Sequence, residues 1–471
     1  MQSRKTFIRH VALTGMALLV EQMNIFGKEH GFSIAENNSE HVIFYRRDST
    51  TAYETLRKGF NKRINKYPDV IALCRDTTGV VEAIQYAKAN NLKVTVKSGG
   101  HCMEGFSALN GGMVINLSLL NEIKWVDGNT ISVGPACTLK KIYEAVIPKG
   151  KYLPGGSCQS VGIGGLTLGG GYGLLSRQFG LTCDSLLRAT MVAGDGRILD
   201  TVSDPELLWA LKGGGNGNFG VVTSMTFRLQ KAPGTMQSFK FRNRNATIPV
   251  AKNICKSWFE LVKTLPTGCF SAFIFNGRTT YILLTSIDRD LKPIKPVIDK
   301  LRQLSTSVSQ GRQLPLGTAL RAYYAQANPL TFKNASAGLY TDFAEIESVI
   351  DNVFTLIRNK PGMLYQVNTL GGHIQQASLE QQSSFPHRDK LYFSELQAYW
   401  ESAAATNGFL KQFEAIQQQF TNAGIKAQYR NYPDINFRDW AQLYYGKSLP
   451  RLQAVKNKYD PARVFGGPQT L

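Results

Sequence analysis

Glycine is concentrated in three short stretches of the 471-residue chain, and no other feature restricts its fold as strongly. The longest stretch covers residues 155–173, and shorter ones cover residues 99–105 and 213–220. Glycine loses more backbone entropy on folding than any other residue, so such runs cost free energy unless the fold needs bare backbone there. We therefore expect a bulky ligand to lie directly against these loops.

The first glycine stretch follows a predicted strand at residues 92–96 and contains the sequence Ser-Gly-Gly-His at residues 98–101. Consecutive glycines after a strand can turn several backbone N–H groups toward one anion, and His101 would project into the same cavity. In the longest stretch, Cys158 lies among glycines, where it could react with a bound ligand. A single histidine or cysteine more often has a structural role, so the prediction of a ligand site rests on both residues lying in glycine-rich loops.

The third glycine stretch contains the pattern GxGxxG at residues 215–220. In a Rossmann fold this pattern leads from a strand into a helix. Here it leads into residues 221–229, which read as a strand, so we reject a Rossmann dinucleotide site. We expect a loop in which the backbone approaches a ligand closely.

The order of predicted elements indicates an α+β protein with two units. Strands and helices alternate through residues 60–232, which we expect to form the ligand-binding unit. Residues 233–426 lack glycine clusters and contain predicted strands at 269–275, 280–285 and 391–399, typical of an antiparallel sheet. Helical patterns lie between these strands, for example at residues 343–357 and 409–420. Residues 427–471 form a third segment, which we expect to return to the first unit.

Composition excludes several classes of protein. Hydrophobic residues make up 43% and charged residues 19% of the chain, which is typical of a globular protein. The net charge of +20 is high, but no dense Lys/Arg run is interleaved with aromatic residues, so we expect no nucleic-acid partner. The six histidines show no paired spacing and the seven cysteines form no CxxC pair, so we expect no metal site.

Residues 1–30 have features of an export signal. Arg4 and Lys5 precede an apolar run at residues 11–20, and the sequence of residues 3–8 resembles a twin-arginine signal with Lys5 in place of the second arginine. The apolar run is too short to span a bilayer. We expect a periplasmic or secreted protein; an ordinary amphipathic N-terminal segment on a cytoplasmic protein is the alternative.

The glycine stretches and the end of the chain together resemble the berberine-bridge-enzyme-like branch of the vanillyl-alcohol-oxidase family of flavoproteins. The family pattern Arg-Ser-Gly-Gly-His appears here with Lys97 in place of the arginine. The other matching motifs lie at residues 156–173, 209–222, 431–434 and 460–465. The resemblance is strong over residues 65–235 and 427–471 and weak over the middle third. It implies a PCMH-type domain that binds flavin adenine dinucleotide (FAD), with an inserted antiparallel-sheet substrate domain.

The resemblance implies two covalent links to the flavin, from His101 to the 8α-methyl group and from Cys158 to C6. It also implies a set of cofactor-binding residues: Ser98, Gly99, Gly100, His101, Gly105, Cys158, Val161, Gly162, Gly165, Gly169, Gly173, Gly220, Val222 and Asn431. Lys97, and Asn116 in place of a common aspartate, depart from the family pattern. Both could alter contacts near the cofactor pyrophosphate.

On the substrate side, the resemblance implies that Tyr432 is the catalytic base, with Tyr429 as the next candidate. A tyrosine hydroxyl has an ordinary pKa of about 10, so it is mostly protonated, and a poor base, at neutral pH. We therefore expect cations and the flavin ring to lower the pKa of Tyr432. The family has an acidic or polar helper on a strand that matches residues 391–400, where either Ser394 or Glu395 could take this role.

The expected reaction is hydride transfer from an alcohol or a sugar hemiacetal carbon to the flavin. Val161 matches a residue that is valine in members reactive with oxygen, so molecular oxygen is the expected acceptor and hydrogen peroxide the product. Oxidative ring closure or alcohol oxidation of a secondary metabolite is the alternative. A non-catalytic basic binding protein on a flavin fold is a more distant alternative, which His101, Cys158 and Tyr432 together argue against.

Overall fold

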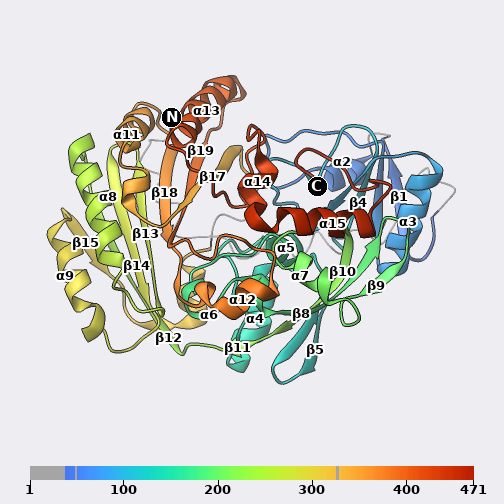
Figure 1. Cartoon of the computed structure of the whole chain (residues 1–471), viewed down its shortest axis with the longest axis horizontal. Helices are drawn as coiled ribbons and strands as arrows, with labels where there is room; N and C mark the ends of the chain where they lie inside the picture. The colour runs from blue at the N-terminus through green and yellow to red at the C-terminus, as the bar shows by residue number, and fades with distance from the viewer. Residues whose placement is uncertain (1–37, 48–49, 325–327) are drawn as a thin grey trace.

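The computed structural model describes residues 38–47, 50–324 and 328–471, so the predicted export segment lies outside the described residues. The described chain forms two units that lie side by side, and its last segment returns to the first unit (Figure 1). Helices and several separate sheets make up the molecule, which confirms the predicted α+β class.

The first unit contains a four-stranded sheet in the order β1-β2-β4-β3. Its strands are β1 (Val42–Arg46), β2 (Val70–Cys74), β3 (Val94–Lys97) and β4 (Met113–Asn116). Strands β2, β3 and β4 are parallel, while β1 runs antiparallel to β2 and extends the sheet upstream of residue 60. The helix α3 (Thr77–Ala89) links β2 to β3. Its N-cap is Asp76, whose carboxylate accepts a hydrogen bond from Gly79 N.

A second sheet in this unit is antiparallel, in the order β5-β6-β10-β8-β9. Its strands are β5 (Ile123–Asp127), β6 (Thr130–Val133), β8 (Leu186–Ala193), β9 (Ile198–Asp200) and β10 (Gly220–Arg228). Strand β10 confirms the prediction that the GxGxxG loop leads into a strand. The helices of this part are α4 (Leu139–Val146), α5 (Ile163–Leu168) and α7 (Pro205–Leu211). Side chains from the sheet and from α4 and α7 share one buried core.

The second unit is built on one large antiparallel sheet in the order β15-β12-β14-β13-β18-β19-β17, with β16 paired to β12. Its strands are β12 (Thr235–Asn243), β13 (Cys269–Asn276), β14 (Thr279–Ser286), β15 (Ser307–Gln310), β16 (Leu314–Pro315), β17 (Phe332–Tyr340), β18 (Met363–Thr369) and β19 (Tyr392–Tyr399). The three strands predicted in this region are therefore confirmed. The predicted helix at residues 343–357 is only partly present, because a 3₁₀ turn at Phe343–Glu345 precedes the helix α11 (Ile350–Arg358).

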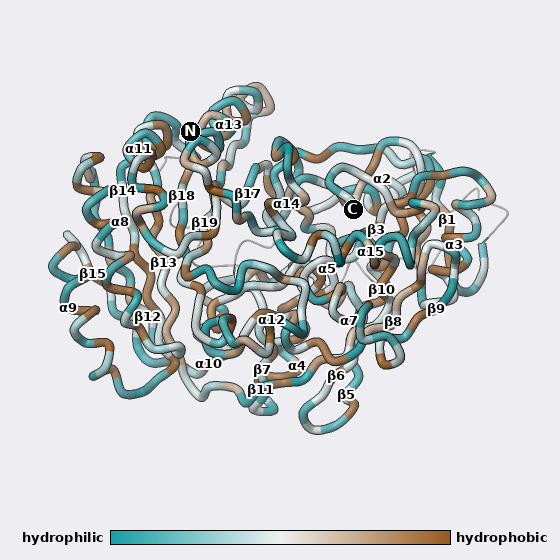
Figure 2. The backbone as a smooth tube through the Cα atoms, viewed as in Figure 1, coloured by the Kyte–Doolittle hydropathy of each residue, from teal (hydrophilic) through white to brown (hydrophobic). Residues whose placement is uncertain are grey.

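Helices cover the outer face of this sheet and leave the inner face turned toward the first unit (Figure 1). They are α8 (Ile248–Val262), α9 (Lys295–Gln303), α11 and α13 (Thr406–Asn422). Hydrophilic and hydrophobic segments alternate along α9 in Figure 2, because Val297, Ile298 and Leu301 are buried while the rest of the helix faces solvent. No helix in the described part of the chain has both the length and the apolar character needed to cross a bilayer.

The end of the chain completes the first unit. The helices α14 (Trp440–Tyr445) and α15 (Leu449–Tyr459) lie over it, and α15 packs on α7 (Figure 1). The buried Lys456 Nζ lies 2.6 Å from Asp460 Oδ2 and donates to the carbonyls of Asn218 and Phe465. Phe465 also forms a β-bridge with Val94 at the start of β3. The tail is therefore fastened to the third glycine stretch and to strand β3, which precedes the first one.

Candidate active site

A cavity of ≈ 440 Å³ lies between the two units. Its walls come from all three glycine stretches, from the inner face of the large sheet and from the C-terminal tail. The prediction that the glycine loops surround a ligand site is consistent with this arrangement. No group of three or more His, Cys, Asp or Glu side chains in the described chain is placed to hold a metal ion.

Close backbone contact brings the first two glycine stretches together. A Cβ atom on Gly99 would lie 2.5 Å from Gly162 N and 2.7 Å from Gly162 Cα, so no side chain fits between the two loops. A Cβ atom on Gly165 would meet nothing within 4 Å, because that face of the backbone is open. The bare backbone thus serves two purposes: it joins the two loops, and it leaves room beside them for a ligand.

His101 and Cys158 line the same cavity and contact the same hydroxyl group. His101 Nε2 lies 3.0 Å from Ser160 Oγ, and Cys158 Sγ lies 3.9 Å from this oxygen. The ring of Phe60 stacks on the imidazole, with centroids 4.0 Å apart and planes inclined by 20°. Burial lowers the pKa of His101 to about 4 and raises the pKa of the Cys158 thiol. His101 is therefore a neutral imidazole, held in one orientation, at neutral pH.

Most of the predicted cofactor-binding residues line this cavity. Those that do are Ser98, Gly99, Gly100, His101, Cys158, Val161, Gly162, Gly165, Gly173, Gly220, Val222 and Asn431. Two predicted residues do not line it. A Cβ atom on Gly105 would clash with the Ile64 side chain at 2.4 Å, and one on Gly169 would clash with Asn431 Oδ1 at 2.1 Å. These two positions are glycine because other side chains pack against them, and their predicted contact with the cofactor stays a prediction.

The two departures from the family pattern also lie outside the cavity lining. Lys97 Nζ donates to the carbonyl oxygens of Leu56, at 2.7 Å, and Lys58, at the end of the helix α2 (Thr51–Arg57). Asn116 is buried and its side-chain oxygen accepts from Ser118 N at 2.9 Å. Neither side chain lines the cavity, so any effect on cofactor contacts would act through the neighbouring loop, and the expectation stays a prediction.

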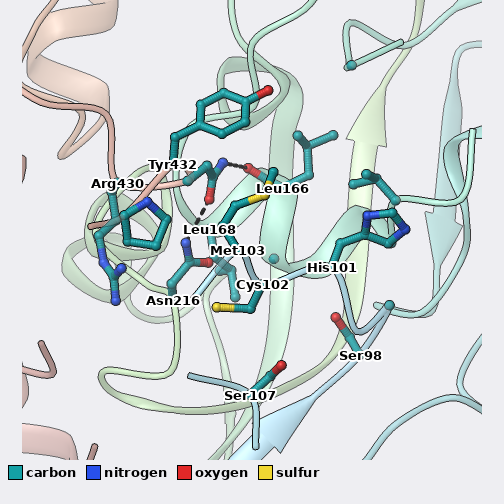
Figure 3. Close-up of a pocket in the computed structure, with 18 of the residues that line it drawn as sticks. Ser98, His101, Cys102, Met103, Ser107, Leu166, Leu168, Asn216, Arg430 and Tyr432 are labelled. Atoms are coloured by element: carbon teal, nitrogen blue, oxygen red, sulfur yellow. Dashed lines mark hydrogen bonds between the residues drawn. The ribbon is translucent and has the colours of Figure 1, made fainter. Parts of the chain in front are cut away.

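Tyr432 presents a free hydroxyl group to the cavity. Its ring stacks on Phe393, with centroids 5.3 Å apart and planes inclined by 13°. No hydrogen bond joins the hydroxyl to another described residue, and in Figure 3 it points away from the Arg430 guanidinium. Burial raises the pKa of Tyr432 well above 10, and the negative charge of Glu395 raises it further. The expectation that cations of the protein lower this pKa is therefore wrong, because burial and the Glu395 carboxylate both raise it.

The hydroxyl of Tyr429, by contrast, is fully engaged by the protein. It accepts hydrogen bonds from Gly171 N at 2.9 Å, Tyr172 N at 3.1 Å and Asn431 Nδ2 at 3.1 Å. Burial raises the pKa of Tyr429 to about 12. Since these three donors occupy the phenolic oxygen, the geometry favours Tyr432 over Tyr429 as the group that meets a substrate.

Strand β19 shows which of its two candidate helpers faces the cavity. Glu395 lines the cavity, whereas Ser394 points to the other side and contacts Tyr340 Oη at 2.7 Å. Successive side chains on a strand point to opposite faces, so only one of the two residues can face the site. Glu395 accepts hydrogen bonds from Asn334 at 3.0 Å and Asn368 at 3.4 Å, and burial raises the pKa of its carboxyl group.

Two cavity residues on β18 were not identified from the sequence. Gln366 is paired directly with Glu395 across the strands, and its Nε2 donates to Asn368 Oδ1 at 2.7 Å. Both amides line the cavity beside the carboxylate. Their spacing of two residues in an otherwise apolar strand is the signal that could have identified them.

Asn216 is another residue that the sequence did not single out. Its Nδ2 donates to Asn431 Oδ1 at 2.8 Å, and Asn431 Nδ2 donates to the Leu166 carbonyl at 2.9 Å. The dashed lines in Figure 3 mark these two hydrogen bonds. They tie the third glycine stretch and α5 to the segment that carries Tyr432.

Comparisons with known proteins agree with this site. The family described as FAD binding domain matches residues 68–202, and the family described as berberine and berberine like matches residues 428–471. The FAD-linked oxidoreductase YgaK of Bacillus subtilis is 29% identical over 89% of this chain and 94% of its own. A chitooligosaccharide oxidase of Gibberella zeae is 26% identical over 88% of this chain and 89% of its own. The solved structure of Physcomitrella patens BBE-like 1 has a TM-score of 0.83 at 24% identity, covering 91% of this chain and 96% of that one.

The fold and the two matching families define a flavoprotein oxidoreductase that uses FAD. Both family models match this chain and its relatives are named FAD-linked oxidoreductases, which confirms the resemblance found in the sequence.

Proposed function

We propose that this enzyme is an oxidase of alcohols or sugar hemiacetals. The observation that carries the proposal is the position of Tyr432 and Glu395, which face the same cavity as His101 and Cys158. When bound, the flavin supplies a two-electron acceptor for the substrate C–H bond and passes the electrons to molecular oxygen, giving hydrogen peroxide. The protein supplies position and proton transfer.

We further propose that His101 and Cys158 hold the flavin covalently. Three features of the site fit such a group: the open backbone at Gly165, the neutral imidazole of His101 and the cysteine on the same wall. A neutral imidazole has a lone pair with which to form a bond, which a protonated ring lacks. Ser160, hydrogen-bonded to His101 and near Cys158, would hold both groups in place.

The C-terminal segment and the large sheet of the second unit bind and deprotonate the substrate in this proposal. Tyr432, whose oxygen has no protein partner among the described residues, would accept the proton of the reacting O–H group as its phenolate, and the bound oxidised flavin is the group that would stabilise this anion against the effect of burial. The buried carboxyl group of Glu395 lies beside it, held by Asn334 and Asn368. Gln366 and Asn368 offer both donors and acceptors to further hydroxyl groups, which favours a polyhydroxylated substrate. The similar chitooligosaccharide oxidase is named for such a substrate.

A second candidate reaction is ring closure or alcohol oxidation of an aromatic secondary metabolite. The observation that favours it is the pair of aromatic rings that line the cavity, Tyr172 and Tyr432, which both pack on Phe393, Tyr172 edge to face at 5.6 Å and Tyr432 by stacking. Such aromatic rings would also stack on a sugar ring. The amide groups of Gln366 and Asn368, which line the same cavity, therefore favour a sugar as the substrate.

The experiment starts with the colour of the purified protein. We expect a yellow protein that stays yellow after acid precipitation and gives a fluorescent band on a denaturing gel. His101→Ala and Cys158→Ala should each keep flavin attached, and the double variant should lose it. An unchanged flavin mass and spectrum in Cys158→Ala would contradict the second link, and a colourless protein would favour a binding protein instead. Sugars and aromatic alcohols are then screened for anaerobic bleaching of the flavin and for peroxide formation in air.

We also propose that residues 1–30 direct export, from Arg4, Lys5 and the apolar run that follows. Residues 1–35 fused to a folded reporter should carry it out of the cytoplasm. A reporter that remains inside would contradict export.

A further inference from the structure

The cavity between the two units contains one cationic side chain. Among the described residues that line it, only Glu395 and Arg430 carry a full charge, because His101 is neutral at neutral pH. FAD has a diphosphate with two negative charges, and an anion removed from water needs a counter-charge or several hydrogen bonds. Arg430 is therefore the side chain of the cavity lining that could supply a counter-charge to the diphosphate.

Arg430 is buried without a carboxylate partner. It is 6% exposed, and no acidic residue of the described chain forms an ion pair with it. Its Nε donates to Tyr445 Oη at 3.1 Å and its Nη2 donates to the Gln469 carbonyl at 3.2 Å. These neutral acceptors hold the guanidinium in place but do not cancel its charge. The hydrogen bonds of Arg430 to described residues use Nε and Nη2 and leave Nη1 without a partner, and the residue lines the cavity.

The guanidinium lies where the first glycine stretch meets the C-terminal tail. Its carbon is 5.6 Å from the ring centroid of Phe106, which follows this stretch directly and also lines the cavity. Gly467 and Thr470 of the tail also line the cavity. Lys97, the cation that the sequence places beside this loop, points instead to the carbonyls of Leu56 and Lys58. Arg430 is thus the cation that can act together with the backbone N–H groups of the glycine loop.

We propose that Arg430 is the counter-ion of the cofactor diphosphate. The inference rests on FAD binding, and it is independent of the proposed substrate and of the covalent links. A guanidinium suits this task because its charge is permanent and its planar fork matches phosphate oxygens. We therefore expect Arg430 to strengthen the binding of flavins that carry phosphate and not of flavins that lack it.

The test compares FAD with riboflavin, which has the same ring system and no phosphate. Both are titrated, by quenching of flavin fluorescence, into flavin-free full-length protein carrying His101→Ala and Cys158→Ala, or into the parental protein if that proves to release its flavin. Adding Arg430→Met should weaken FAD binding about 10- to 100-fold and leave riboflavin binding unchanged. Arg430→Lys should restore part of the loss. Riboflavin binding serves as the control for folding, and Arg430→Gln replaces the methionine variant if the latter is insoluble.

Tyr445→Phe is the matched control, since it removes the hydrogen bond to Arg430 Nε but keeps the charge. It should leave the ratio of FAD to riboflavin affinity near the parental value. An equal loss of both flavins in Arg430→Met would show a purely structural role and overturn the proposal, as would no loss of either. If Arg430→Met leaves the ratio of FAD to riboflavin affinity unchanged but raises the KM for glucuronate and not for glucose, Arg430 binds an anionic substrate instead. That result would also overturn the proposal. Parental protein that binds neither flavin would contradict FAD binding itself.

Discussion

Lys333 Nζ lies 2.8 Å from Asp434 Oδ1, and both side chains are almost fully buried. The same ammonium group lies 2.7 Å from Glu104 Oε1. The other carboxylate oxygen of Glu104 pairs with Arg63. Lys333 belongs to β17, Glu104 follows His101 by three residues, and Asp434 follows Tyr432 by two. One buried cation therefore ties the sheet of the second unit to the segments that carry the proposed attachment and catalytic residues.

We expect Lys333→Met to destabilise the protein strongly. It leaves two buried carboxylates without their common cation, a change that costs about 3 to 5 kcal/mol of unfolding free energy. Denaturant unfolding of the variant and the parental protein measures the difference. Lys252→Met is the control, because its pair with Asp351 is exposed and should contribute less than about 1 kcal/mol. Equal small effects in the two variants would contradict the role of Lys333.

Tyr432→Phe should slow reduction of the flavin by about 10²- to 10⁴-fold, because it removes the proposed base and keeps the ring. Stopped-flow measurement of the flavin absorbance under anaerobic conditions gives the rate, while flavin content and Tm should stay close to the parental values. A variant that reduces its flavin at the parental rate would move the base elsewhere.

Tyr429→Phe should have the opposite profile. It deprives Gly171 N, Tyr172 N and Asn431 Nδ2 of their common acceptor, so it should lower stability by about 1 to 3 kcal/mol. Its effect on the rate should be smaller than that of Tyr432→Phe, measured in the same stopped-flow assay. A larger rate loss in this variant, at unchanged Tm, would make Tyr429 the base.

Val161→Leu should slow the reaction of the reduced enzyme with oxygen and leave the anaerobic reduction rate unchanged. Val161 lines the cavity, and a larger side chain there reduces the space next to the flavin. Mixing the reduced protein with oxygenated buffer measures reoxidation directly. Parental protein that stays reduced for minutes in air would contradict the assignment as an oxidase.

The buried imidazole of His387 should make stability depend on pH. Its Nε2 lies 3.0 Å from the Leu443 carbonyl, and burial lowers its pKa from 6.5 to about 4. The unfolded chain therefore binds a proton that the folded protein does not, so stability is fully present above pH 6.5 and is lost as the pH falls toward 4. Between pH 7 and pH 4.5 the loss should be about 2 kcal/mol, measured by urea unfolding. His387→Gln should show a flatter pH dependence; an identical slope in the variant would assign it to other groups.

Parts of the site could be predicted from the sequence because they are local. The residue patterns around His101 and Cys158 each lie within one loop, and their glycine neighbours mark a backbone that something must approach. Gly105 and Gly169 look the same in the sequence but are glycine because Ile64 and Asn431 pack against them. Only the folded chain distinguishes these two reasons for a glycine.

Other parts depend on contacts between distant segments. Arg430 reads as a surface charge until Phe106 and Gln469 are placed beside it. The expected low pKa of Tyr432 relied on cations that the sequence could not place, whereas the pKa depends on burial and on Glu395. The fold itself was more accessible, since strands such as β13 and β14 follow from local patterns of apolar residues, although β1, which pairs with β2, was not predicted.

The C-terminal tail, which supplies Arg430, Asn431, Tyr432 and Thr470 to the cavity, has a consequence for biosynthesis. The glycine loops leave the ribosome more than 200 residues before this tail, and domains generally begin to fold during synthesis from the N-terminal end. A nascent chain can therefore form the sheets of both units but cannot close the cavity until this tail has been synthesised. Cofactor loading in the cell is thus expected to follow synthesis of the tail, and a polypeptide that stops before Tyr432 would fold into two recognisable halves around a site that lacks its proposed base.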